Sequence, residues 1–242
     1  MAQRTVNVGL VGFGTVGIGV AKIILEHGDT IEAKTGIRLN LSCVVDTDTQ
    51  RKRPVTLPQG LLTDKMDTLL NNKDITVGVE LVGGTGVARD IQIKILESGK
   101  DVVTANKALL AAKGSELFAA ARKLGRCIAF EASCAGGIPI VSAIRTGLAA
   151  NDIQGLFGIV NGTCNFILSS MTAKGSSFAE ALTLAQQKGY AEANPALDIS
   201  GGDSSHKLAI LSSIAFGEDI RLEDLHVEGI EQISHLDIRY GL

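Results

Sequence analysis

The sequence lacks several features that define whole classes of protein. It has no tryptophan, only 4 prolines and only 4 cysteines among 242 residues. The cysteines lie far apart at irregular spacings, and no pair has the short spacing of a zinc knuckle. Because 45% of the residues are hydrophobic, the chain can build a large core without a disulfide framework. We therefore expect free thiols, a reducing compartment and a cytoplasmic protein.

Long apolar runs and clusters of one charge are also missing. No stretch of 18 uninterrupted apolar residues exists, so we expect no transmembrane helix. The 23 basic and 26 acidic residues nearly balance, and the densest basic stretch is Arg51 to Arg53. Nucleic-acid binding needs clustered Lys and Arg, so we exclude a nucleic-acid partner. Residues 5–20 are apolar but contain five glycines and no small-residue cleavage site, which argues against a signal peptide.

The first 130 residues alternate between two patterns. Short, nearly continuous apolar runs are typical of strands buried on both faces, which favours a parallel sheet. Between these runs, apolar residues such as Val16, Val20 and Ile23 recur at helical spacing. The alternation predicts an α/β fold, a Rossmann-type parallel sheet with helices on both faces, in a dinucleotide-binding domain over 1–131. The predicted strands are Val6–Val11, Leu39–Val45, Val77–Val82, Asp101–Thr104 and Cys127–Phe130.

The pattern changes after residue 131. Only Ile153–Val160 reads as a strand there, and 189–202 is a long connection with Gly189, Pro195 and two further glycines. A single strand cannot satisfy its own edges. We therefore predict an incomplete α+β substrate domain over 132–242, and expect that more chain follows or that a partner supplies strands. The predicted helices are 139–148, 163–173, 177–188 and 203–216.

A glycine-rich turn directly follows the first predicted strand and opens the first helix. In such a turn the first glycine permits the tight turn, the second lets the backbone approach a pyrophosphate, and the third lets the helix pack closely. The free backbone N–H groups and the helix dipole favour an anion. The strand–turn–helix context predicts dinucleotide binding. The candidate residues are Gly12, Phe13, Gly14, Thr15, Val16 and Gly17.

The choice between NAD and NADP stays open. Asp46 ends the second predicted strand, where a carboxylate can bind a ribose 2′-hydroxyl and favour NAD. It lies farther from the glycines than usual, and 28–38 is interpreted as an insertion that explains the delay. Arg51 and Lys52 could instead hold a 2′-phosphate and favour NADP, or these charges could form a solvated loop.

The later strand ends should face the same cofactor, because open α/β sheets bind ligands beyond the carboxyl ends of their strands. Gly84 and Thr85 follow one strand there. Thr104 and Ala105 follow the next, just before Lys107 in the first turn of a helix. A cation is disfavoured by the dipole at that position, so we favour a lysine that faces the substrate over a surface lysine.

The segment 189–207 concentrates carboxylates around one lysine. Asp203 lies in the first turn of a predicted helix, and Lys207 follows four residues later on the same face. Apolar residues continue that face, so the pair points inward, where an ion pair seldom adds stability. Chemistry explains it better, although a structural ion-pair network is the alternative. With Glu192 and Asp198 nearby, the group could hold a substrate ammonium while Lys207 delivers a proton.

The stretch from Ala185 to Lys207 resembles the signature of homoserine dehydrogenases. Similar segments follow one another in the family's order over essentially the whole chain. Besides the glycine turn they are Glu80–Thr85, Thr104–Leu110, Glu131–Ser133, Asn161–Leu168 and His206–Leu211.

The resemblance implies NAD(P)-dependent interconversion of homoserine and aspartate 4-semialdehyde, a step toward threonine, methionine and isoleucine. It implies that Glu192 and Asp203 contact this small-molecule substrate, that Lys207 donates the proton, and that Lys107 lies by the nicotinamide. It also implies a homodimer when full length and a monovalent-cation site, usually sodium. The backbone carbonyls of that site would be those of Glu131, Cys134, Gly136 and Ile138.

The chain departs from the family in two ways. Asn194 stands where the family often has Asp before proline. Family members also continue well past the point that matches Leu242, and many bacterial ones add an ACT domain, so we expect a truncated chain. Two alternatives stay open at this stage, another Rossmann amino-acid dehydrogenase and a nucleotide-binding fragment without catalysis.

Overall fold

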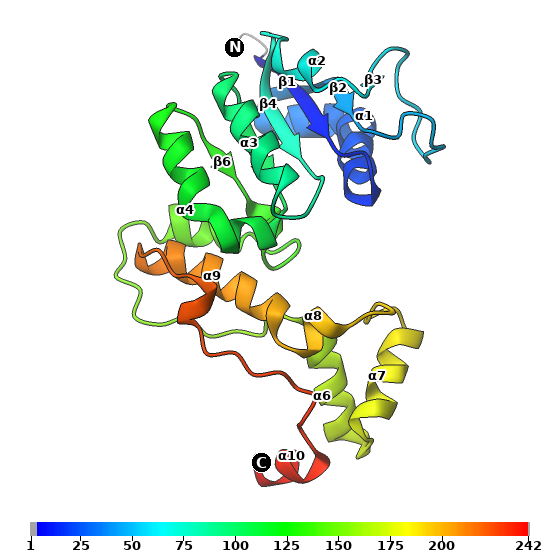
Figure 1. Ribbon diagram of the computed structural model, residues 1–242, viewed down its shortest axis with the longest axis vertical. Coiled ribbons are helices and arrows are strands. Elements are labelled where there is room, and N and C mark those ends of the chain that lie inside the picture. Colours follow the sequence, from blue (N-terminus) through cyan, green and yellow to red (C-terminus); the bar gives the residue numbers. More distant parts are fainter. Residues whose placement is uncertain (1–3, 242) are drawn as a thin grey trace. The chain divides into compact units, whose positions relative to one another are not determined.

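The computed structural model describes residues 4–241 and divides the chain into two compact units (Figure 1). They are Met1–Gly137 and Ile138–Leu242, where the sequence places the boundary after residue 131. Each unit has a hydrophobic core of its own. One core lies around Leu10 and Val44, and the other around Ile167 and Met171.

The first unit is the predicted Rossmann-type sheet. Six strands form one sheet in the order β3-β2-β1-β4-β5-β6, and every neighbouring pair is parallel. The order reverses between β1 and β4, and open sheets of this kind usually bind ligands beyond the carboxyl ends of the strands at such a point. The strands are β1 Arg4–Val11, β2 Ile37–Val45, β3 Leu62–Thr63, β4 Ile75–Glu80, β5 Asp101–Thr104 and β6 Ile128–Ala129.

Helices cover both faces of this sheet, as predicted. Successive side chains of a strand point to opposite faces. Val8 and Leu10 of β1 share a buried cluster with Ile24 of α1, which spans Thr15–Thr35. On the other face, Gly78 of β4 makes room for Ile95, because a Cβ there would lie 2.7 Å from the Ile95 side chain. Ile95 belongs to α3 (Val87–Glu97), which packs against α4 (Lys107–Lys123).

Three details of this unit could not be read from the sequence. Most of the segment interpreted as an insertion, 28–38, continues α1, which runs without interruption to Thr35 and ends at Gly36 in a left-handed conformation. The last strand contains only Ile128–Ala129 instead of Cys127–Phe130. The short β3 and the helix α2 (Met66–Leu70) were not predicted, since neither is long enough to show a period.

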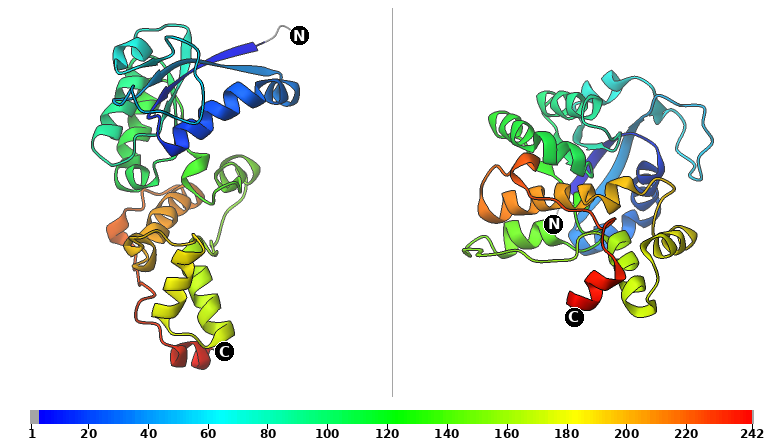
Figure 2. Two further views of the ribbon diagram at one scale, coloured as in Figure 1. Left: turned by 90° about the vertical axis from the view of Figure 1, so that its right-hand side faces the viewer. Right: turned by 60° about the horizontal axis from the view of Figure 1, so that its bottom comes forward.

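The second unit is helical, and its four main helices lie where the sequence predicts them. The helices α6 (Gly162–Lys174) and α7 (Phe178–Gln187) lie side by side (Figure 2). Their buried residues Ile167, Met171, Ala181 and Ala185 belong to one hydrophobic cluster. The long connection before α9 contains one short helix, α8. The helices are α5 Ile140–Ser142 with a π-helical turn Ala143–Gly147, α6 Gly162–Lys174, α7 Phe178–Gln187, α8 Ala196–Ile199, α9 Gly202–Phe216 and α10 His235–Gly241. Two 3-10 turns, Glu131–Ser133 in the first unit and Leu222–Asp224 in the second, complete the helical elements.

The strand predicted over Ile153–Val160 is wrong. The described residues of the second unit contain no strand, and this segment makes no ladder with any of them. Phe157 is 98% exposed and Ile159 is 79% exposed, so these two apolar side chains pack against almost nothing in the described residues. A strand needs a neighbour to pair its backbone groups, and the predicted α+β character is therefore absent from this unit.

The membrane prediction can be compared with the helices directly. Among residues 4–241, no helix combines the length and the apolar composition that crossing a bilayer requires.

We predict that Gly17→Ala destabilises the protein, because the added Cβ would collide with the carbonyl oxygen of Gly12. A shift of α1 should cost about 1–3 kcal/mol of unfolding free energy. Gly19→Ala in the same helix is the matched control, since nothing lies within 4 Å of its Cβ. It should stabilise the helix by up to about 1 kcal/mol. Urea unfolding of both variants measures the difference, and equal stabilities would contradict the close approach.

Candidate functional site

The glycine turn has the geometry that a bound pyrophosphate requires. Gly12 has φ of 93°, and a Cβ there would lie 2.7 Å from the Leu81 carbonyl group. Gly17 packs directly against Gly12, whereas the space around the Gly14 Cβ position is open. No side chain caps the first turn of α1. The turn therefore leaves room and N–H donors for an anion at the helix start, where Thr15 and Val16 are exposed.

Asp46 joins this turn to the end of β2. Its carboxylate accepts hydrogen bonds from the Phe13 N–H at 2.6 Å and from the Asp48 N–H at 2.8 Å. The Phe13 ring is buried, so Phe13 contributes its backbone to the turn and its side chain to the core. The carboxylate predicted to read the ribose thus also holds the turn in place.

Arg53 is a residue of this site that sequence reasoning missed. Its side chain is only 4% exposed and pairs with Asp46 at 3.2 Å. Its Nε donates to the Phe13 carbonyl oxygen at 2.8 Å, and its guanidinium lies 4.9 Å from the centre of the Phe13 ring. Arg51, by contrast, is exposed, and its side chain pairs with none of the described residues. The run of three basic residues was the available signal, but it could not show which one folds inward.

The loops after β4 and β5 are tied together at the same edge of the sheet. Gly83 and Gly84 both have positive φ and open space at their Cβ positions. Asn106 donates through Nδ2 to the Gly84 carbonyl oxygen at 2.8 Å, and its Oδ1 accepts from Leu109 to cap α4. Asn106 is therefore the N-cap of α4. Lys107 is the first residue of α4, which begins at the edge of the sheet where the cofactor is predicted to bind.

In the second unit, the structure brings three of the four predicted polar residues together. Lys207 and Asp203 form an ion pair of 2.7 Å one turn apart on α9. Asn161, 6% exposed, donates through Nδ2 to Asp203 at 2.9 Å and to Asp198 at 2.8 Å. One nitrogen atom of Asn161 therefore donates hydrogen bonds to two carboxylates. Sequence reasoning did not assign it a role, although a buried asparagine before a helix is a common cap.

Lys207 reaches the edge of this cluster. Its ammonium donates to Asp203 and, at 2.6 Å, to the carbonyl oxygen of Val160. An ammonium has three donors, so one remains unused by the described residues. The side chain is 17% exposed, which leaves that donor accessible to a ligand. A buried anchor with one accessible N–H is the arrangement expected of a proton donor.

Glu192 lies apart from this cluster. It is exposed, and its carboxylate bonds to none of the described residues. Tyr190 stacks on Phe166 with ring centres 4.5 Å apart, and its carbonyl oxygen accepts from Thr163 at 2.7 Å. The connection around Glu192 is thereby held to α6, while the carboxylate itself stays open to solvent.

Cys164 is not a nucleophile in this cluster. Burial raises the pKa of its thiol, and the nearby charges of Asp198 and Asp203 raise it further. The thiol lies 3.2 Å from the carbonyl oxygen of Asp198, to which it donates. A protonated thiol acts here as a packing and hydrogen-bonding group.

The residues predicted to bind a cation fall on both sides of the boundary between the units in the sequence. Glu131, Cys134 and Gly136 belong to the first unit and Ile138 to the second. The structure describes Ala135 between them with φ of 57°, the only positive φ of a residue other than glycine among the described residues. Such an outlier is costly and is commonly kept for function. No group of three or more Cys, His, Asp or Glu side chains in the described part could hold a metal ion.

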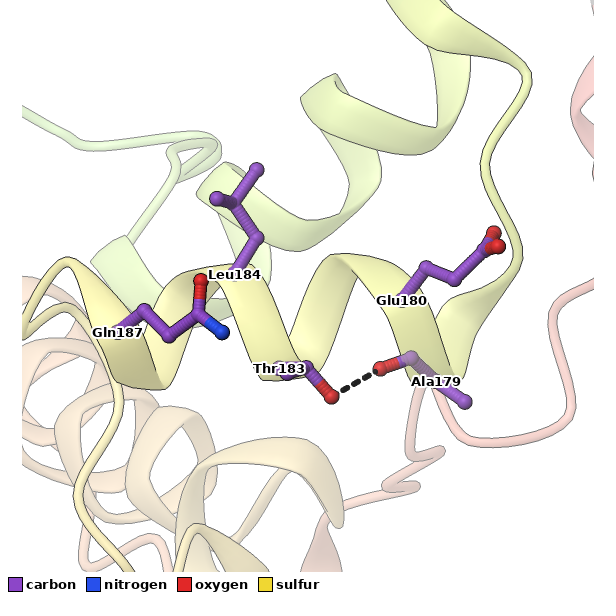
Figure 3. Close-up of a pocket in the computed structure, with 5 residues that line it drawn as sticks. All are labelled: Ala179, Glu180, Thr183, Leu184 and Gln187. Atoms are coloured by element: carbon purple, nitrogen blue, oxygen red, sulfur yellow. Dashed lines mark hydrogen bonds between the residues drawn. The ribbon is translucent and has the colours of Figure 1, made fainter.

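A shallow depression on α7 is separate from these residues. It is lined by Ala179, Glu180, Thr183, Leu184 and Gln187, all from one helix (Figure 3). Thr183 donates to the Ala179 carbonyl oxygen within the helix, and no residue of the polar cluster reaches it. We do not assign a function to it.

Comparisons with known proteins agree with this geometry. Residues 12–131 match the family model "Homoserine dehydrogenase, NAD binding domain", and residues 139–241 match "Homoserine dehydrogenase". A crystal structure from Archaeoglobus fulgidus assigned to the same family is 32% identical, with a TM-score of 0.84 over 97% of this chain and 76% of that one. The chain belongs to the homoserine dehydrogenase family.

Two further homoserine dehydrogenases are more similar in sequence. The Neisseria gonorrhoeae enzyme is 44% identical over 99% of this chain and 55% of its own length. The Thiobacillus denitrificans crystal structure is 43% identical over 98% of this chain and 55% of its own, with a TM-score of 0.89. The chain thus spans about half the length of these two relatives.

We predict that Asn161→Ala destabilises the second unit by about 2–3 kcal/mol, because it removes a helix cap and leaves the buried Asp203 and the partly buried Asp198 short of a donor. Ser177→Ala is the matched control, since Ser177 caps α7 in the same way but is exposed. It should cost about 1 kcal/mol. Urea unfolding followed by circular dichroism compares them, and a loss no larger than that of the control would contradict the bridging role.

Proposed function

We propose that the protein interconverts L-homoserine and L-aspartate 4-semialdehyde with NAD or NADP. The observation that carries the proposal is the ammonium of Lys207, which is anchored by Asp203 and Val160 and keeps one accessible donor. A substrate carbonyl oxygen needs such a donor when it is reduced. Membership of the family supports this reaction over that of another amino-acid dehydrogenase.

The residues of the chain divide the work of the reduction. When bound, a reduced nicotinamide supplies the hydride for the aldehyde carbon. Lys207 gives its proton to the aldehyde oxygen, so that the alcohol of homoserine forms and Lys207 is left neutral. Asp203 aims the ammonium and Lys107 lies beside the nicotinamide and substrate. Glu192 holds the substrate ammonium, which fits its exposed carboxylate, and Asp198 supports the cluster.

The residues of the glycine turn fit a dinucleotide. The open space at Gly14 and the uncapped start of α1 would hold the pyrophosphate. Gly84, Thr85, Thr104 and Ala105 would lie along its nicotinamide half, and Asp46 at the ribose. Arg51 and Lys52 are the exposed cations that could select a 2′-phosphate, since the guanidinium of Arg53 is already used.

Several finer features belong to the same proposal. We expect a sodium ion on the carbonyls of Glu131, Cys134, Gly136 and Ile138, which the strained Ala135 supports. Carbonyl oxygens suit a hard cation of this kind. We also expect a homodimer, a cytoplasmic location, no nucleic-acid or membrane partner, and a place in threonine, methionine and isoleucine biosynthesis.

We predict that Lys207→Ala lowers the rate of aspartate-semialdehyde reduction by about 100-fold or more, because the proton donor is lost. Cofactor affinity should stay unchanged. Lys207→Arg should not restore the rate, since a guanidinium keeps the charge but does not readily release a proton. Glu192→Ala should mainly raise KM. Steady-state kinetics of the protein encoded by the whole reading frame test this. Near-normal turnover in Lys207→Arg would refute acid catalysis by this residue.

We predict that Arg51→Ala weakens NADPH binding about tenfold, the worth of one charge-assisted hydrogen bond, and leaves NADH binding unchanged. Arg53→Ala should weaken both cofactors alike, because it frees the Phe13 carbonyl and Asp46. Fluorescence titration with the two cofactors separates these outcomes. Equal losses for both cofactors in Arg51→Ala would mean that this residue does not read the 2′ position.

A further inference from the structure

Glu80 is a buried carboxylate that the proposed reaction leaves unexplained. It ends β4, is 0% exposed, and forms no ion pair with any of the described residues. Taking a lone carboxylate out of water costs several kcal/mol unless hydrogen bonds replace its hydration. Its surroundings should therefore be rich in donors.

Four donors converge on this carboxylate. Oε1 accepts from the backbone N–H groups of Val82 at 2.7 Å and Gly83 at 3.3 Å. Oε2 accepts from the side chains of Gln92 at 2.8 Å and Thr104 at 3.0 Å. The donors come from the loop after β4, from α3 and from the end of β5. Glu80 thus joins three separate elements.

The network closes into a ring through Asn106. The Thr104 hydroxyl accepts from the Asn106 N–H at 3.0 Å, and the Asn106 side chain donates to Gly84 at 2.8 Å. Gly84 follows Val82 and Gly83 in the loop that Glu80 holds. Both loops that are expected to contact the nicotinamide half of a cofactor therefore depend on one carboxylate.

Stability alone does not account for this arrangement. Apolar residues of similar volume often replace buried charged groups without loss of stability. The network also leaves the Oε1 atom of Gln92, fully buried, without a hydrogen-bond partner, which adds a cost. A charge kept under such a cost at the edge of a ligand-binding crevice is better explained by the ligand.

We propose that Glu80 is a positioning residue for the nicotinamide half of the cofactor, and that its buried charge favours the oxidised over the reduced form. The oxidised nicotinamide ring carries a positive charge and the reduced ring carries none. A carboxylate in a region of low dielectric therefore stabilises only the oxidised form. This inference rests on the proposed cofactor site and adds a determinant of the redox balance there.

The decisive variant is Glu80→Gln, which removes the charge and keeps the shape. The introduced amide oxygen can still accept from Val82 and Gly83. If the Gln92 amide turns over, its unpaired oxygen can accept from the introduced NH₂ group. The introduced NH₂ group cannot accept from the Thr104 hydroxyl, so we expect a small loss of thermal stability. We expect the affinity for oxidised cofactor to fall on the order of tenfold and the affinity for reduced cofactor to stay nearly unchanged. Equilibrium dialysis or fluorescence titration with both forms gives the ratio.

Two further variants keep the test interpretable. Glu80→Ala should weaken the binding of both forms, because the two loops lose their common acceptor. Equal losses for the two forms in Glu80→Gln would overturn the charge effect, and full binding in Glu80→Ala would overturn the positioning role. Gly14→Val distinguishes failure of the proposed site itself. The valine side chain should abolish binding of both forms. The variant should still fold, since a Cβ at position 14 meets no protein atom within 4 Å.

Discussion

The constraint on which the first unit depends is that all its strands are parallel. Parallel strands bring their carboxyl ends to one edge, where Gly12, Glu80 and Thr104 follow or end three neighbouring strands. Close packing at Gly12 and Gly17 excludes residues with a Cβ atom at these two positions. Gly12 touches Leu81, and Gly17 touches Gly12, so the turn, the helix and the neighbouring strand fix one another. A crevice built in this way exists before any ligand enters it.

The second unit differs from the first, because its candidate site is a cluster of charged side chains. Two carboxylates and an ammonium lie around the amide of Asn161, and each is held by a donor or acceptor from another element. Asn161 is the N-cap of α6 and Asp203 lies in the first turn of α9, where the positive ends of helix dipoles favour negative charge. The helix starts therefore offset part of the cost of burying these carboxylates. Asp203 and Lys207, one turn apart, then share a face by the geometry of the helix alone.

Sequence reasoning succeeded where a residue's role follows from its spacing. The parallel sheet, the glycine turn and the Asp203–Lys207 pair all follow from fixed periods, and the structure contains them. It failed where the role depends on contacts between distant segments. The partners of Glu80 and Arg53 lie up to 24 and 40 positions away in the sequence, so no local pattern distinguishes these residues from surface charges. The strand predicted over 153–160 failed for the same reason, because an apolar alternation does not reveal whether a partner is present.

The carbonyl of Val160 gives that unpaired segment a further significance. Lys207 is fixed on one side by a helix and on the other by the last residue of an exposed stretch of backbone. The position of the ammonium is therefore only as well defined as the stretch that precedes it. For the proton donor proposed at Lys207, ordering of that backbone would also position the ammonium, so conformational entropy lost in the segment would lower the entropic cost of aligning the proton.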